Sequence, residues 1–115
     1  MGILLREAED SSPVAGEVVA EATFPTSVLP LTVRRREFGD TIVSHGMHKK
    51  LKKLLCDKNI PRDMRDRLPL VCYGEARTPL WYPTVAFADG FPPPPEGEGI
   101  KITIFYQNPP KGNDL

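Results

Sequence analysis

The sequence predicts a small α+β domain in which strands at both ends of the chain flank two short helices in its middle. Three observations lead to this fold class. The length of 115 residues is that of one domain. Apolar side chains alternate in segments on both sides of the middle, as in strands, and recur at every third or fourth position within it, as in helices. Prolines and glycines separate these segments.

The N-terminal segment, residues 1–16, is polar and is broken by proline and glycine, so we expect a flexible or edge segment there. Residues 17–107 are expected to form the single folded domain, and residues 108–115 a C-terminal tail. Within the domain, residues 17–24 predict the first strand, which a proline ends.

Residues 31–40 predict a strand followed by a structural turn. Successive side chains of a strand point to opposite faces. Leu31 and Val33 are expected to anchor one face of the strand. Arg34 and Arg36 then reach out from the other face, about 6.6–7 Å apart. The turn is expected at Gly39 and Asp40, because glycine tolerates positive φ and aspartate accepts hydrogen bonds from nearby amides.

Residues 47–58 predict an amphipathic helix. Its buried stripe comprises Met47, Leu51, Leu54 and Leu55, and its other faces carry Lys49, Lys50, Lys52 and Lys53. Like-charged neighbours at i,i+3 and i,i+4 each cost about 0.2–0.5 kcal/mol in an isolated helix. An external anion that offsets this repulsion is the more economical explanation of the lysine cluster.

A second, shorter helix is predicted over residues 60–69. Pro61 suits its first turn, and Pro69 lies just past its end. The stripe expected to be buried comprises Ile60, Met64 and Leu68. Arg62, Arg65 and Arg67 lie outside that stripe, where two aspartates partly neutralise them.

Three more segments predict strands. Residues 70–73 are expected to be a buried strand. Residues 80–87 contain Pro83, which favours an edge or bulged strand. In residues 100–106 the apolar side chains alternate cleanly, which predicts a strand with one apolar face. Residues 92–95 are four prolines, typical of a stiff polyproline II loop.

The formal net charge is zero, but the charges are sorted along the chain. Residues 1–30 carry one basic and five acidic side chains, and residues 71–115 carry three basic and five acidic ones. Residues 31–70 carry eleven basic and five acidic ones. A basic middle segment is typical of a face that binds a polyanion. A solvated basic surface without a partner is the alternative.

Several classes of protein are disfavoured by the sequence. It has no apolar run long enough for a membrane helix and no secretory signal, so the expected compartment is the cytoplasm, without membrane association. Cys56 and Cys72 are expected to be two small buried hydrophobes, too few for a disulfide scaffold.

No catalytic or metal-binding residues are predicted. Phosphate-binding glycine loops are not found in the sequence. Ser44 and His45 lack the acidic group that orients a nucleophilic pair. His45, His48 and Cys56 match no strong zinc-ligand spacing.

Four pieces of sequence in a fixed order resemble the C-terminal domain of bacterial tRNA(Ile)-lysidine synthetases. They are an Arg-x-Arg strand, a Gly-Asp turn, a Lys-Lys-Leu helix and an Ile-Pro-x-x-x-Arg-Asp-x-x-Pro segment. Here they fall on Arg34 and Arg36, Gly39 and Asp40, Lys49, Lys50 and Leu51, and Ile60, Pro61, Arg65, Asp66 and Pro69. Trp81 falls where the family has an aromatic or apolar strand. Two positions depart from the pattern: Phe38 replaces a usual proline, and His48 a small residue.

The resemblance implies a β-sandwich-like α+β domain, also seen in the phenylalanyl-tRNA synthetase β subunit. It implies a parent ligase that uses ATP and Mg to attach lysine to the wobble cytidine of an isoleucine tRNA. In that family an N-terminal domain carries the chemistry, so this chain is expected to hold no cofactor and to be inactive alone. The C-terminal domain grips tRNA towards its acceptor stem.

The predicted partners are therefore tRNA and the parent catalytic domain. The residues expected to contact RNA are Arg34, Arg36, Lys49, Lys50, Lys52, Lys53, Arg62 and Arg65. Arg65 has an equal alternative as structural support, paired with Asp40 or Asp66. The alternative for the whole chain is a protein-interaction module that docks on the catalytic domain, or forms a homodimer, without touching RNA.

Overall fold

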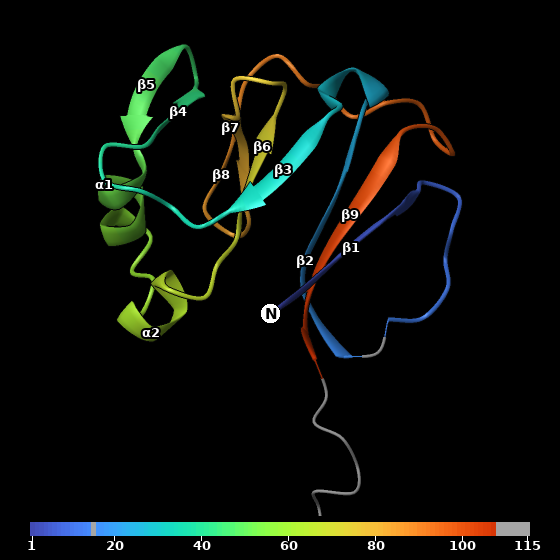
Figure 1. Ribbon diagram of the computed structural model, residues 1–115, viewed down its shortest axis with the longest axis horizontal. Coiled ribbons are helices and arrows are strands. Elements are labelled where there is room, and N and C mark those ends of the chain that lie inside the picture. The colour runs from blue at the N-terminus through green and yellow to red at the C-terminus, as the bar shows by residue number, and fades with distance from the viewer. Residues whose placement is uncertain (15, 108–115) are drawn as a thin grey trace, which may run out of the picture.

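The chain folds into three layers, two of them β-sheets (Figure 1). The computed structural model describes residues 1–14 and 16–107. The first layer is an antiparallel sheet in the order β1 (Gly2–Glu7), β9 (Ile100–Gln107), β2 (Gly16–Phe24). The second, here called the central sheet, has the order β3 (Leu31–Arg34), β6 (Leu70–Tyr73), β7 (Thr78–Tyr82), β8 (Ala86–Phe87).

The third layer, here called the basic layer, is formed by residues 35–68. It holds the hairpin of β4 (Thr41–Ser44) and β5 (Met47–Lys50) and the helices α1 (Leu51–Asp57) and α2 (Arg62–Arg65). A single 3-10 turn, η1 (Thr26–Val28), links the first two layers. The described chain is thus mostly strand with two short helices, and none of its helices is long and apolar enough to span a membrane.

One hydrophobic cluster fills the space between the first sheet and the central sheet. Ile102 and Ile104 of β9 are fully buried there, as the alternation of that strand predicts. The rest of this cluster comprises Phe24, Val28, Val71, Leu80 and Trp81. The rings of Phe24 and Trp81 lie 5.7 Å apart between centroids, in a tilted arrangement that aromatic pairs favour.

A second cluster joins the other face of the central sheet to the basic layer. Leu70, Cys72 and Tyr82 come from the central sheet, and Leu51 and Leu55 from α1, and all five are fully buried. Leu68 is buried beside them, and Ile60 and Met64 pack at the margin, so the stripe expected in the second helix is confirmed. The basic layer therefore rests on the central sheet through its apolar side.

The first sheet takes in more of the chain than the expected domain of residues 17–107. Residues 2–7, expected to be flexible or at an edge, form the edge strand β1 and pair with β9 along their whole length. A Cβ atom at Gly2 would lie 2.5 Å from Cζ of Phe105, so a larger residue there would force that ring to move away from β1. The expected tail, residues 108–115, lies outside the described residues.

The expected strand over residues 31–36 is too long, and one of its two expected anchors is exposed. β3 ends at Arg34, and Val33, expected to anchor it, is 41% exposed. Arg34 instead turns inward and is half-buried. The alternation was read correctly: Leu31 packs against the cluster between the two sheets, as expected, and Arg34 on the other face has a partner within the chain, described below.

The helix expected over residues 47–58 is also wrong in its first four positions. Met47–Lys50 form β5, so Met47 is not part of the buried stripe and is 62% exposed. The turn before it has φ of +54° at His45 and +73° at Gly46, which suits a tight hairpin. The backbone amides of both residues donate to the carboxylate of Asp89, at 3.0 and 2.7 Å. The hairpin turn, held by Asp89, therefore makes residues 47–50 a strand although their apolar spacing is that of a helix.

Two smaller expectations also change. The segment 80–87 is not one strand: β7 ends at Tyr82, a turn follows at Pro83 and Thr84, and β8 forms the edge of the central sheet. Of the two cysteines, Cys72 is buried as expected, but Cys56 is exposed on α1.

Candidate nucleic-acid interface

The turn after β3 is held by a paired arginine and aspartate. Arg34 donates to the two carboxylate oxygens of Asp40, from Nη1 at 2.8 Å and from Nη2 at 3.0 Å. The same carboxylate accepts from the amide of Glu37 at 2.6 Å. The backbone oxygen of Asp40 accepts from the amide of Leu51, the first residue of α1, at 3.0 Å. Asp40 thus ties strand, turn and helix together.

The electrostatics of this pair follow from its geometry. The hydrogen bonds from Arg34 lower the pKa of Asp40 below its ordinary value, against the opposing effect of burial. The hydrogen bonds to Asp40 raise the pKa of Arg34 above its ordinary value. Both groups stay charged at neutral pH, and Arg34 is committed to the turn rather than to the surface.

A shallow hollow, here called the turn hollow, lies between this turn and the start of α1. Its volume is about 230 Å³. It is lined by Arg36, Glu37, Phe38, Gly39, Asp40, Lys50 and Lys52. Gly39 has φ +87°, so the turn predicted at Gly39 and Asp40 depends on its glycine. Lys50 and Lys52 are exposed, and their ammonium groups are accessible to an external anion.

Arg36 is placed differently from Arg34. It is half-buried, and its Nε is buried without a hydrogen-bond partner within the described part of the chain. Its guanidinium lies near the hydroxyl of Tyr82: burial raises the pKa of that hydroxyl, and Arg36 partly opposes the effect. A buried N–H without a partner is uncommon in proteins. Nε of Arg36 is unpaired in the described residues, as is Nε of Arg6.

A second hollow, here called the hairpin hollow, lies on the other side of Lys50. Its volume is about 320 Å³. It is lined by Met47, His48, Lys49, Lys50, Lys53, Leu54 and Asp57. Lys53 is exposed on α1, whereas Lys49 is half-buried on β5. The four lysines come from a strand and a helix rather than from one helix, and they are brought together around these two hollows.

The two arginines of the second helical segment have different environments. Arg62 is exposed on α2. Arg65 is half-buried, and its Nε donates to the backbone oxygen of Ile60 at 2.8 Å. The hydroxyl of Tyr82 donates to the backbone oxygen of Arg65 at 3.5 Å. Arg65 is thus held by a backbone carbonyl, while the carboxylate of Asp40 belongs to Arg34.

Two features of this surface were missed by sequence reasoning. Phe38 is 96% exposed at the apex of the turn, although the sequence marked it only as a departure from a family pattern. Arg35 is exposed on the face opposite Arg34. An aromatic residue inside an Arg-Arg-Arg-Glu-Phe-Gly-Asp turn was the available signal, because a tight turn of that kind has no room to bury a ring.

The structure offers no assembled catalytic centre in the residues it describes. No group of three or more His, Cys, Asp or Glu side chains is placed to hold a metal ion in that part of the chain. Oγ of Ser44 lies 3.1 Å from Nδ1 of His45, a contact between neighbours in the β4–β5 turn. The nearby Asp89 carboxylate is occupied by backbone amides rather than by the histidine ring.

Comparison with known proteins gives concordant results. Residues 31–104 match the family model of the TilS substrate C-terminal domain. The chain is 42% identical over 74 residues to a tRNA(Ile)-lysidine synthase of Thermotoga maritima, covering 64% of this chain and 18% of that protein. It is 31% identical over 125 aligned positions to the tRNA(Ile)-lysidine synthase of Symbiobacterium thermophilum, covering 91% of this chain and 25% of that protein.

A solved structure is also similar. The crystal structure of a TilS C-terminal domain superposes with a TM-score of 0.57 at 27% identity, covering 91% of this chain and 80% of the other. The fold of mostly strands with few helices is thus shared with that domain. The chain spans about a fifth to a quarter of the length of the curated relatives it matches.

Proposed function

Because this chain belongs to the family of TilS substrate C-terminal domains, we propose that it binds tRNA through its basic layer and positions it for a catalytic domain. The tRNA would be held towards its acceptor stem, and the catalytic domain would attach lysine to the wobble cytidine with ATP and Mg. The chemistry belongs to that other domain, and this chain alone is expected to be inactive. The similarity of this fold to the β-sandwich-like domain of the phenylalanyl-tRNA synthetase β subunit stays a prediction.

The observation that carries this proposal is that the cations of the basic layer fall into two groups. Some are paired within the chain, and the others are left to contact RNA. Two of the expected contact residues, Arg34 and Arg65, are held by partners within the chain and act as positioning residues. The cations left for RNA are Arg36, Lys49, Lys50, Lys52, Lys53 and Arg62. Arg36 and the four lysines line two adjoining hollows, and Arg62 lies exposed on α2.

The chemistry of this surface suits RNA phosphates better than an apolar partner. Exposed lysines on a rigid hairpin and helix act as point charges that neutralise phosphates and release counterions. Duplex RNA hides its base edges in a deep, narrow groove, so a protein recognises its shape, phosphates and 2′-hydroxyls. The domain is therefore expected to prefer folded tRNA to single strands while reading little sequence.

The alternative, docking on the catalytic domain or a homodimer, rests on a different part of the surface. Phe87 of the edge strand β8 is 53% exposed and stacks on Trp81 at 5.7 Å between ring centroids. The amide of Asp89, just after β8, donates to the backbone oxygen of Val43 in β4, so the exposed ring rather than the strand edge would contact another chain. Such an association would bury apolar surface and would resist moderate salt.

The test is binding of the chain to total tRNA and to an unstructured RNA at low and moderate salt, measured by electrophoretic mobility. A preference for tRNA is expected, with affinity that falls steeply as salt rises. The slope of log K against log salt should be about −5 if each of the six cations left for RNA contacts one phosphate. If tRNA is not bound even at low salt, the proposal fails and the docking alternative takes its place.

A further inference from the structure

The most exposed large apolar side chain in the described chain lies within the basic layer. Phe38 is 96% exposed, whereas the other exposed large apolar residues of the described chain range from 38% to 62% exposed. Exposed apolar side chains are common when they are scattered singly. What distinguishes Phe38 is how firmly its backbone is held and what surrounds it.

The backbone of Phe38 is fixed by a closed turn. The amide of Asp40 donates to the backbone oxygen of Glu37 at 3.1 Å, so Phe38 is the second of the four turn residues. Gly39 follows at φ +87°, as the third position of a type II turn requires. The carboxylate of Asp40, itself held by Arg34, closes the turn a second time through the amide of Glu37. The ring is therefore presented to solvent on a rigid support, which lowers the entropic cost of engaging a partner.

The surroundings of the ring combine apolar walls with positive charge. The turn hollow next to Phe38 is lined by Arg36, Lys50 and Lys52, whose side chains combine aliphatic stems with positive charges. Glu37 is the one lining carboxylate outside the Arg34–Asp40 pair. Nε of Arg36 is a buried donor without a partner in the described residues. A nucleotide has the matching chemistry, because its base offers a flat π-face and its phosphate a negative charge.

We propose that Phe38 stacks on an unpaired nucleobase of the bound RNA, while Arg36, Lys50 and Lys52 contact the adjoining phosphates. This inference rests on the proposed function and adds to it a specific contact with a base. A base in the middle of a duplex is covered on both faces by its neighbours. The partner of Phe38 is therefore an unpaired base of a single-stranded extension next to a helix end.

The first test uses two RNA probes, a blunt hairpin and the same hairpin with a single-stranded 3′ extension. The unchanged chain should prefer the extended hairpin. Phe38→Ala should bind that probe about ten- to a hundred-fold more weakly, as removal of a stacking aromatic does. The variant should bind the blunt hairpin almost as well as the unchanged chain does. Its slope of log K against log salt should be unchanged, because no charge is lost.

The controls separate stacking from apolar contact and from misfolding. Phe38→Trp and Phe38→Tyr should restore the preference for the extension, and Phe38→Leu should not. Leu5→Thr removes an exposed apolar side chain of β1, outside the basic layer, and should leave binding unchanged. Phe38→Trp also gives a direct signal, because a stacked base should quench the fluorescence of the new indole while the buried Trp81 is insensitive.

Three outcomes would overturn the inference, each with a different meaning. If the unchanged chain binds the extended RNA and Phe38→Ala binds it equally well, only the base contact is wrong. If Phe38→Ala weakens both probes equally, or Phe38→Leu restores binding, the ring makes an apolar contact that is not a base stack. If the unchanged chain binds no RNA at low salt, the proposed function fails and this inference fails with it.

Discussion

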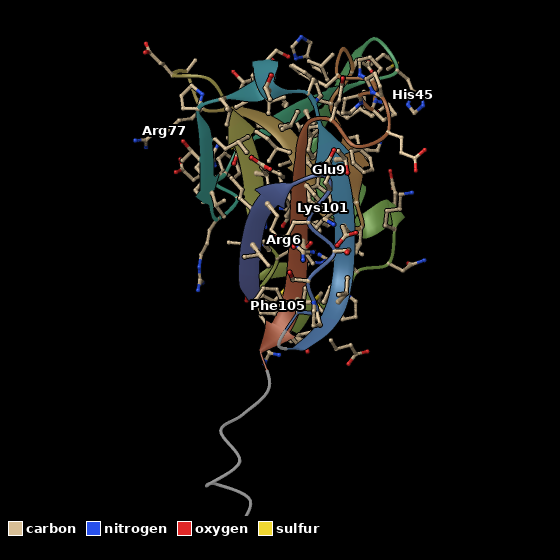
Figure 2. The ribbon with its side chains drawn as sticks, turned by 90° about the vertical axis from the view of Figure 1, so that its right-hand side faces the viewer. Arg6, Glu9, His45, Arg77, Lys101 and Phe105 are labelled. Atoms are coloured by element: carbon tan, nitrogen blue, oxygen red, sulfur yellow. The ribbon has the colours of Figure 1, made fainter. Side chains whose placement is uncertain are left out.

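The outer face of the first sheet and the basic layer use the same kinds of charged residue in opposite ways. On the outer sheet face, the guanidinium of Arg6 lies among side chains of β1, β9 and the loop after β1, close to Lys101 (Figure 2). Its side chain is only 7% exposed. In the basic layer, Lys50, Lys52 and Lys53 are exposed to solvent. The two terminal nitrogens of Arg6 are paired within the chain, although its Nε has no partner in the described residues, and the charges of the three lysines are available to a partner.

The partners of Arg6 show why its charge is structural. Its Nη1 donates to the backbone oxygen of Ser12 at 2.5 Å, and its Nη2 donates to Oγ1 of Thr103 at 3.3 Å. The carboxylates of Glu21 and Asp10 lie 3.5 and 3.8 Å from it. Lys101 adds a hydrogen bond to the backbone oxygen of Asp10. This network fastens the loop after β1 over the sheet. A binding surface is therefore identified by whether its charged groups have partners within the chain, not by residue type alone.

The largest effect on stability is expected from Arg6→Met. It removes two hydrogen bonds and leaves two carboxylates without their counter-charge. Because those carboxylates are about two-fifths exposed, the cost is below that of a fully buried pair, about 2–3 kcal/mol. Urea denaturation measures it. Arg35→Met, at an exposed position, is the matched control and should change stability by less than about 0.5 kcal/mol. An equal loss in both variants would contradict the contrast between the two regions.

The next effect is expected from Asp40→Asn in the basic layer. It weakens the hydrogen bonds from Arg34 and from the amide of Glu37, at a cost of about 1–2 kcal/mol for a partly exposed pair. RNA binding should also fall, because the turn that presents Phe38 and Arg36 loosens. The free energy of unfolding and the affinity for tRNA are measured on the same preparation. Reduced stability with full affinity would show that the turn does not organise the interface.

The same pair predicts a dependence of stability on pH. The folded-state pKa of Asp40 is lowered, so its contribution is fully present above the unfolded-state pKa of about 3.9. That contribution is lost as the pH falls through the lower folded-state pKa. The difference in unfolding free energy between the unchanged chain and Asp40→Asn should therefore be constant from pH 7 to about pH 5 and should shrink below about pH 4. A difference that grows on acidification would contradict the assignment of the charge.

The sequence predicted the elements that burial defines, and it failed where a distant or a charged partner decides the local structure. The strand over 100–106 and the stripe of Ile60, Met64 and Leu68 were predicted because burial imposes a regular period. The segment 47–58 was mistaken for one helix because the hairpin depends on Asp89, more than forty residues away in sequence. The inward turn of Arg34 likewise depends on Asp40, which periodicity does not register. The cluster of lysines was found, but the strand and helix that carry it were not told apart.

A smaller effect is expected from Lys52→Ala and Lys53→Ala, which should change RNA affinity but not stability. Each should weaken tRNA binding and lower the salt slope by about one unit, because each loses one phosphate contact. Binding isotherms at several salt concentrations measure both quantities. The control is Arg77→Gln, at an exposed turn of the central sheet away from the basic layer (Figure 2). If Arg77→Gln lowers the salt slope as much as the two lysine variants do, tRNA binding depends on the overall charge of the chain and not on the lysines of the basic layer.

The smallest effect is expected from Lys49→Ala, and it sharpens the contrast within the basic layer itself. If residues 47–58 were one helix, Lys49 and Lys53 would be neighbours one turn apart and would contribute alike. In the structure Lys49 is half-buried on β5, and its charge acts on Asp89, whose pKa is lowered mainly by the amides of Gly46 and His45 and to a small extent by Lys49. Part of its charge is therefore directed within the chain, and Lys49→Ala should lower the salt slope by clearly less than Lys53→Ala does. Equal slopes for the two variants would mean that partial burial does not decide which lysines bind RNA.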